Sequence, residues 1–270
     1  THPFTSEQVC RIFQLFIQEL KELENTGDDI FSQRVVMLQS LSQNSTCVTL
    51  IDALVQESDN STAIGNNHSY IGRGDEEDVL LDLFSTALST VNSQTDKSVF
   101  ELIGDILVTC IFEMEDRGVP ETILEVLLKP LVPELRNENL SPDNSIEGNV
   151  ISINRPPPSY KLVKELILFC GRNFIDSICN FINDMLSERK DYSNSEIKNY
   201  LYPIIYELHL LGSTKEQPED YVFKIMGNLK SHLRIDDEAK RLQCVALLGK
   251  MFSESIKLSK THSEVFKLFA

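Results

Sequence analysis

Apolar residues recur along most of this chain at the spacing of one face of an α-helix, and this periodicity constrains the fold more than any other feature. In the first segment the apolar side chains begin at Val9 and follow at i+3, i+4, i+7 and i+8. Thr5 and Ser6 precede the segment as candidate N-caps, and Gly27 follows it as a candidate stop. The pattern therefore predicts a helix from about Ser6 to Glu24.

The same periodicity returns in later segments. It predicts a helical pair over residues 79–91 and 99–114, and further helices over residues 123–135, 160–170, 174–185, 197–211, 221–233 and 242–252. The two-residue alternation typical of a half-buried strand is missing, so a β-sheet is not expected. The acidic run from Asp75 to Asp78 precedes the pair. We interpret it as negative charge at the positive end of a helix dipole rather than as a metal site, because adjacent acids on a helix do not converge.

The spacing between the predicted helices indicates a repeat. Phe174 and Tyr221, and likewise Ile197 and Leu242, lie about 45 residues apart, and each interval holds two predicted helices. This is the period of HEAT repeats, whose two-helix units stack because neither can cover its own apolar stripe. The predicted fold is an all-α HEAT-repeat solenoid, a right-handed superhelix of antiparallel helix pairs, formed by residues 1–270 as a single segment of a longer protein.

Two polar stretches, at about residues 56–74 and 137–159, are predicted to be surface loops. The second ends in Arg155-Pro156-Pro157-Pro158, which favours extended polyproline geometry and should separate two helices. A ligand for a partner that binds Pro-rich segments is an alternative, but we favour a spacer.

The composition fits a globular chain that buries its core without disulfides or metals, since 41% of its 270 residues are hydrophobic and 24% are charged. The apolar runs are too short to span a membrane. Six cysteines and several Asn-x-Ser/Thr sequons leave a secreted, disulfide-bonded protein open. We favour reduced cysteines, because Cys110 and Cys170 lie inside apolar helical stripes, where buried thiols are ordinary core residues.

The net charge of −16 is unevenly distributed, because residues 221–270 hold nine Lys or Arg against five Asp or Glu. Binding to phosphate backbones needs a clustered basic surface, so direct binding to nucleic acid is not expected from this chain. The basic end is a candidate site for an acidic partner or a polyphosphate, although a solvated helix surface explains the same residues. The candidate residues are six of these nine cations: Lys224, Lys230, Arg234, Lys240, Arg241 and Lys250.

Motifs of catalysis or metal binding are weak. Gly72-Arg73-Gly74 is too short to be a phosphate-binding loop, and Cys170 and Cys179 lack the paired spacing of a zinc site. His209 lies beside an apolar stripe and is interpreted as a core or interface residue. Several scattered cations are interpreted as solvated helix surface: Arg34, Lys161, Lys164, Arg172, Arg189 and Lys190. The sequence therefore favours a binding protein over an enzyme.

Four segments, taken in order, resemble one known family. They are Pro3-Phe4-Thr5-Ser6 with the helix that follows, Leu83-Phe84-Ser85 to Val91-Asn92, Leu128-Lys129-Pro130-Leu131-Val132-Pro133, and Asp236 to Phe252 with its D-x-E-x-R-L-like start. No single segment is specific, but their joint order resembles the cohesin-associated regulators called precocious dissociation of sisters proteins. The polar stretches 56–74 and 137–159 depart from that family's length.

The resemblance implies a chromatin-associated HEAT-repeat protein of the nucleus that helps to control sister chromatid cohesion. It implies binding to the cohesin kleisin and other cohesin subunits, to a Wapl-type releasing factor and to a sororin-type protector through short peptide motifs. Pro3 and Phe4 match the end of the family's docking motif, although His2 replaces its usual alanine. The resemblance implies no cofactor matched to residues here, although an inositol polyphosphate is known in the family.

The sequence leaves two other function classes open. A HEAT or armadillo adaptor for transport or phosphatase assembly would share the architecture without the ordered segments. An all-helical enzyme with a site assembled across repeats is the third class, and no motif supports it.

Overall fold

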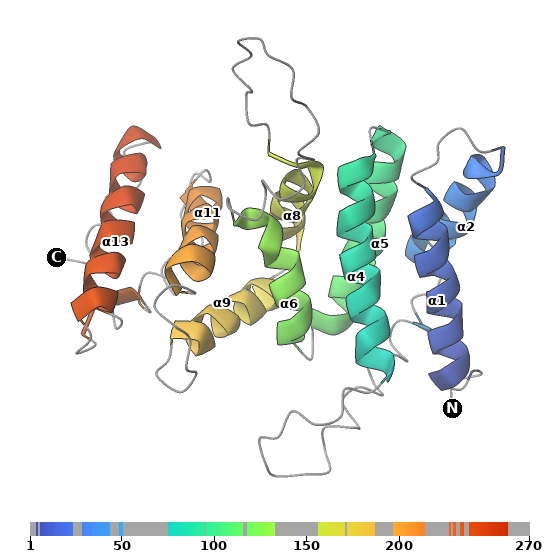
Figure 1. Ribbon diagram of the computed structural model, residues 1–270, viewed down its shortest axis with the longest axis horizontal. Helices are drawn as coiled ribbons and strands as arrows, with labels where there is room; N and C mark the ends of the chain where they lie inside the picture. The colour runs from blue at the N-terminus through green and yellow to red at the C-terminus, as the bar shows by residue number, and fades with distance from the viewer. Residues whose placement is uncertain are drawn as a thin grey trace, which may run out of the picture. The chain divides into compact units, whose positions relative to one another are not determined.

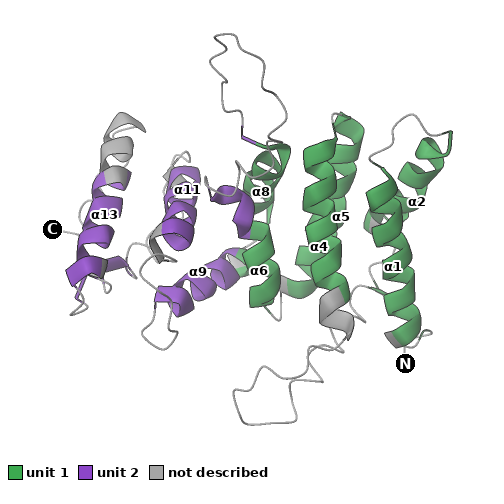
Figure 2. Cartoon of the chain, in the orientation of Figure 1, with its two compact units in different colours: residues 1–127, 157–174 green, residues 128–156, 175–270 purple. Residues whose placement is uncertain are grey.

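The structure is a computed structural model that describes residues 4, 6–23, 29–43, 49–50, 75–94, 96–115, 118–132, 156–170, 172–186, 197–213, 227, 229–230, 233–234 and 238–258. Every regular element within these ranges is a helix, which confirms the all-α class. The chain divides into two compact units (Figure 2). Unit 1 comprises Thr1–Leu127 and Pro157–Phe174, and unit 2 comprises Leu128–Pro156 and Ile175–Ala270.

Unit 1 is built from helix pairs that stack side by side. Its helices are α1 (Ser6–Glu22), α2 (Phe31–Gln43), α4 (Asp75–Ser93), α5 (Lys97–Glu115), most of α6 (Glu121–Leu128) and α8 (Pro158–Phe169). Helices α4 and α5 are joined by a short link and run antiparallel, α1 packs against α4, and α2 packs against α5 (Figure 1). Each helix of one pair thus meets its counterpart in the next pair, which is the stacking of HEAT repeats.

The core of unit 1 consists of the apolar stripes that the periodicity predicts. Phe13 and Leu20 of α1 and Phe84 of α4 have no exposed surface, and the stripes of α4 and α5 are buried along their lengths. Burial of such stripes is what holds short helices in place, because isolated helices of this length are only marginally stable in water. The first helix ends close to its predicted boundary, while Glu24 and Gly27 lie outside the described residues.

Polar side chains of α4 complete the C-terminal end of α1. The hydroxyl of Thr90 donates to the carbonyl of Leu20 at 3.3 Å, and the Gln94 amide nitrogen donates to the carbonyl of Leu23. The Leu20 carbonyl also accepts from the backbone N–H of Leu23 at 3.2 Å, so Thr90 adds a second donor there. The last carbonyls of a helix lack partners within the helix, and Gln94 supplies one to Leu23. These side-chain bonds also fix how far α1 can slide along α4.

Helix α8 receives its N-terminal cap from a residue distant in sequence. Pro158 is its first residue and Pro157 has no side-chain acceptor, while the backbone N–H of Ser159 donates to Oδ1 of Asn92 on α4 at 2.9 Å. Proline suits the first helical position because it has no N–H to satisfy. The loop predicted over residues 137–159 is therefore wrong at its end, since Pro158 and Ser159 already belong to the helix; residues 137–155, and the whole stretch 56–74, lie outside the described residues.

We expect Asn92→Ala to lower the free energy of unfolding by about 0.5–2 kcal/mol, the usual cost of losing a helix N-cap. Asn92→Asp keeps an acceptor oxygen and should cost less. Urea denaturation followed by circular dichroism measures both variants. Equal stability of the alanine variant and the wild type would show that Asn92 does not cap α8.

Arg34 corrects one interpretation of the sequence. It was expected on a solvated surface, but its side chain is only 11% exposed and lies between α2 and α1. Its Nε is 2.9 Å from the Glu19 carboxylate, and a second guanidinium nitrogen is 3.7 Å from the Glu22 carboxylate. A planar guanidinium can serve two carboxylates at once, which a periodicity argument on α2 alone does not reveal. Lys161, by contrast, is exposed as predicted.

Proline residues split two of the helices that periodicity predicts as continuous. The helix predicted over 123–135 is α6 followed by a 3₁₀ turn, Lys129–Leu131, that contains Pro130. The helix predicted over 197–211 consists of a π-helical turn, Ile197–Leu201, followed by α11 (Tyr202–Ser213), and Pro203 lies at their junction. Proline lacks the N–H that a helix interior needs, so regular hydrogen bonding changes at both sites.

Unit 2 also contains α9 from Ile175 onward, since this helix spans Arg172–Leu186, and α13 (Glu238–Leu258). Helix α11 packs against α13, and Cys244 Sγ of α13 donates to the carbonyl of Leu229 at 3.6 Å. Gly227, Leu229 and Lys230 are helical, and the rest of the helix predicted over 221–233 falls mostly outside the described residues.

Candidate partner-binding surfaces

A groove between α5 and α8 is a concave surface in the described part of unit 1. Lys161 lies over the Phe100 ring at 5.4 Å from its centroid, and the rings of Phe112 and Phe169 lie 6.2 Å apart. Early residues of α5 thus meet early residues of α8, and late residues meet late residues. The two helices therefore run in the same direction and enclose a groove of about 640 Å³.

The floor of this groove is apolar, and the two helices approach each other closely there at Gly104. A Cβ on Gly104 would lie 3.4 Å from Cδ1 of Leu162, which is van der Waals contact, so the backbone of α5 lies close to α8 at this point. Leu166 and Val108 continue the floor. At the C-terminal end, Phe112 is 45% exposed and Phe169 is 67% exposed although they touch each other. Two large aromatic side chains thus remain largely in solvent beside an apolar floor.

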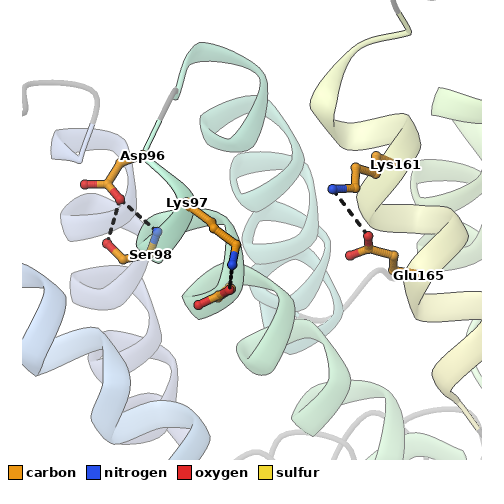
Figure 3. Close-up of polar contacts among 6 residues, drawn as sticks. Asp96, Lys97, Ser98, Lys161 and Glu165 are labelled. Atoms are coloured by element: carbon orange, nitrogen blue, oxygen red, sulfur yellow. Dashed lines mark hydrogen bonds and ion pairs between the residues drawn. The ribbon is translucent and has the colours of Figure 1, made fainter.

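Charged side chains line the N-terminal half of the groove. Glu101, Asp105 and Glu165 contribute to its walls, whereas none of the residues lining it is Lys or Arg. Lys97 and Lys161 lie at the edge, paired one turn along their own helices with Glu101 at 3.0 Å and Glu165 at 3.6 Å (Figure 3). These pairs are well exposed, so their attraction is weak.

Asp96 caps the start of α5 next to this charged end (Figure 3). Both the backbone N–H and the hydroxyl of Ser98 donate to its Oδ1 at 2.8 Å. Both bonds favour the charged carboxylate and so lower the pKa of Asp96 below its ordinary value, and the bond from the Ser98 hydroxyl has the larger effect. The cap thus fixes the first turn of the helix that forms one wall of the groove.

The pKa of Asp96 is lower in the folded protein than its unfolded-state value of about 3.8, so Asp96 stabilises the fold at pH values above about 3.8. This contribution is lost as the pH falls through the folded-state pKa. We expect Asp96→Ala to be less stable than the wild type at pH 7, with the difference shrinking in strong acid. Asp96→Asn keeps an acceptor that cannot titrate. Urea unfolding at both pH values measures the effect, and a difference independent of pH would contradict it.

The residues proposed from sequence as a docking site lie elsewhere. Phe4 is 40% exposed, while Pro3 lies outside the described residues, and neither lines the groove. In the basic end, Lys230 and Arg234 are exposed, but most of the other cations have side chains that are not described. The docking role of Pro3 and Phe4 and the role of the basic end therefore stay predictions.

The described histidine and cysteine residues that could take part in catalysis or metal binding are buried. His209 lies in the core as predicted, and the five described cysteines are buried and free, as the reduced interpretation requires. Burial raises the pKa of the Cys110 thiol to about 12, with a smaller effect from Glu113, and burial raises that of Cys244 to about 11. Both thiols are protonated at neutral pH, which is the unreactive form.

The described residues contain no group of three or more His, Cys, Asp or Glu that could hold a metal ion. None of the described helices is both long and apolar enough to cross a membrane.

Phe112 and Phe169 are the surface residues that sequence reasoning missed. Periodicity assigns apolar residues to the core, and both fall within apolar segments. The available signal was their position next to the stripe residues Ile111 and Cys170 rather than in register with them, which places them on the outer face of each helix.

Stacked antiparallel helix pairs define a helical-repeat protein, and comparisons with known proteins identify the family. The family model for "Sister chromatid cohesion protein PDS5 protein" matches residues 1–64 and 71–270. The chain belongs to this family, as the four ordered sequence segments indicate.

Individual relatives agree with this assignment. The chain is 24% identical to human sister chromatid cohesion protein PDS5 homolog A and 23% identical to human homolog B, in each case over 93% of this chain. It spans about 15% of the length of these relatives. A solved structure of a Pds5–Scc1 complex superposes on 94% of this chain and 35% of that chain, with a TM-score of 0.59 and 17% identity. That likeness confirms the fold.

Proposed function

We propose that this protein is a cohesin-associated regulator of sister chromatid cohesion that acts as a binding scaffold. The observation that carries the proposal is the family match along nearly the whole chain, because the relatives share the name of sister chromatid cohesion proteins. A fold of stacked helices does not by itself define a function, so the proposal depends on family membership rather than on the solenoid.

The proposed partners are the cohesin kleisin and other cohesin subunits. Support comes from the solved Pds5–Scc1 complex, which shares this fold and is described with its implications for cohesin function. A Wapl-type releasing factor and a sororin-type protector are proposed as further partners, on the resemblance alone. Binding partners of this kind require no bond chemistry, and the protonated buried thiols and buried His209 fit a role other than catalysis. We place the protein on chromatin in the nucleus.

Phe4 is the proposed anchor for short peptide motifs, with Pro3 beside it. Its partial exposure leaves a large aromatic side chain available to a ligand. We expect Phe4→Ala in the full-length protein to weaken binding of a Wapl-type peptide by about 1–3 kcal/mol, the usual effect of removing an aromatic anchor. Fluorescence anisotropy with a labelled peptide measures the change. Leu15→Ala, which alters an exposed apolar residue of α1, serves as the control; unchanged affinity of the Phe4 variant would reject this site.

The function itself is tested by affinity purification of the full-length protein from nuclear extract, followed by mass spectrometry. We expect recovery of cohesin subunits together with a Wapl-type factor. Recovery of transport receptors or phosphatase subunits in their place would support the adaptor class and contradict the proposed role. Inositol polyphosphate stays an expectation from the resemblance, and isothermal titration against the full-length protein tests it.

A further inference from the structure

We propose that the groove between α5 and α8 is a second docking site, which takes a short segment of a partner protein that carries an apolar anchor flanked by Lys or Arg. The inference stands on the residues of the groove and does not depend on the cohesin role. The site is separate from Phe4, which does not line the groove.

The apolar end supplies the anchor pocket. Phe112 and Phe169 form a tilted pair whose rings lie 6.2 Å apart, yet 45% and 67% of these residues stay exposed. Leu168 beside them is also exposed. Exposed aromatic clusters next to an apolar floor are typical of places where a partner inserts a large side chain. A leucine or aromatic side chain inserted here would bury the faces of both rings.

The charge of the groove selects the flanking residues. Its lining holds three carboxylates, those of Glu101, Asp105 and Glu165, and no cation. Asp105 has no ion-pair partner among the described residues, while the other two are held only by exposed lysines of their own helices. An incoming Lys or Arg would therefore meet the carboxylate of Asp105 and two carboxylates that are only weakly paired, whereas an acidic segment would meet repulsion. Arg is favoured further, since it can also stack on the exposed rings.

The dimensions of the groove favour a short segment over a globular surface. A volume of about 640 Å³ is that of a small-ligand pocket and holds a few side chains. It is bounded by two parallel helices and, at one side, by Ser42 and Gln43 at the end of α2. A segment lying along the groove would place its anchor against the exposed faces of the paired Phe112 and Phe169 rings and its cations along the acidic half.

The test uses the full-length protein and three sets of short synthetic peptides with the same apolar anchors. The first set has Lys or Arg beside the anchor, the second has Asp or Glu there, and the third keeps the cations but replaces the anchor with serine. We expect binding by the first set alone, weakened by added salt because exposed charges contribute. Equal binding by the first two sets, or no binding by any, would overturn the proposal.

Variants then assign the binding to this groove. We expect Phe112→Ala and Phe169→Ala each to weaken the best basic peptide by about tenfold or more. The double variant Asp105→Asn and Glu165→Gln should weaken it and reduce its dependence on salt. The matched controls are Leu15→Ala and Glu7→Gln, which change exposed residues of α1 outside the groove and should bind like the wild type.

Two alternative occupants give different results. If a second copy of the chain fills the groove, Phe169→Ala will lower the molar mass measured by light scattering, and the peptides will not compete with self-association. If a segment of this chain fills the groove, one of a set of overlapping peptides covering the protein's own sequence will bind in preference to the basic set. Either result contradicts docking of a partner segment.

Discussion

Replacing Phe84 with alanine is expected to lower the free energy of unfolding by about 3–5 kcal/mol, the range for truncating a buried aromatic residue. Phe84 has no exposed surface and lies on α4, which packs against both α1 and α5. The cavity left behind would lie on the helix that packs against both α1 and α5. Because stacked repeats are stabilised through their interfaces, the loss of stability should extend to both of these helices.

Phe169→Ala is the matched control, since it removes the same side chain from an exposed site in the same unit. It should change the stability by less than about 1 kcal/mol, as most exposed substitutions do. Urea denaturation followed by circular dichroism and by tyrosine fluorescence measures both variants. If the two variants were equally stable, the buried stripe of α4 could not be the core of unit 1.

Leu38→Ala should weaken the packing of α2, at a cost of about 2–5 kcal/mol, because it removes a fully buried side chain of that helix. Among the described side chains of α2, that of Leu38 is fully buried, while Val36 and Met37 beside it are exposed. The contact of α2 with α5 therefore depends heavily on one leucine. Hydrogen exchange should report the loss as faster exchange of the α2 amides, with α4 less affected.

Val36→Ala provides the comparison, because it shortens an exposed residue on the same helix. Its exchange pattern should match that of the wild type. Uniform acceleration of every helix by Leu38→Ala would show that α2 is not a separately detachable element, and no acceleration would show that Leu38 does not hold it.

The helices that could be predicted are those with one continuous buried face. The described apolar stripes of α1, α4 and α5 are buried and pack against neighbouring helices, so the 3.6-residue period is strong in the sequence. Helix α2 was not predicted as a separate helix. Among its described side chains only Leu38 is fully buried, and exposed apolar residues such as Val36 obscure its period.

Contacts distant in sequence explain the remaining differences. Asn92 belongs to a segment that resembles the family, but its bond to the backbone of Ser159 joins residues 67 positions apart, and periodicity within α4 gives no sign of it. Arg34 likewise pairs with Glu19 across two helices. Such contacts depend on how the pairs stack, which a single sequence does not specify.

The family could be recognised from the order of four segments, whereas the groove could not. Its aromatic and acidic side chains come from α5 and α8, which lie on either side of the polar stretch 137–159. Only the stacking of the helices brings Phe112 to Phe169 and places Asp105 and Glu165 in the same groove. The two docking hypotheses thus have different origins, the first in resemblance and the second in structure.

The proposed role in cohesion is tested most directly by rapid depletion of the full-length protein in dividing cells of its own species, with sister chromatid pairing scored on chromosome spreads before anaphase. We expect the sisters to separate early and re-expression of the wild-type protein to restore their pairing. Normal pairing after complete depletion would contradict a role in cohesion.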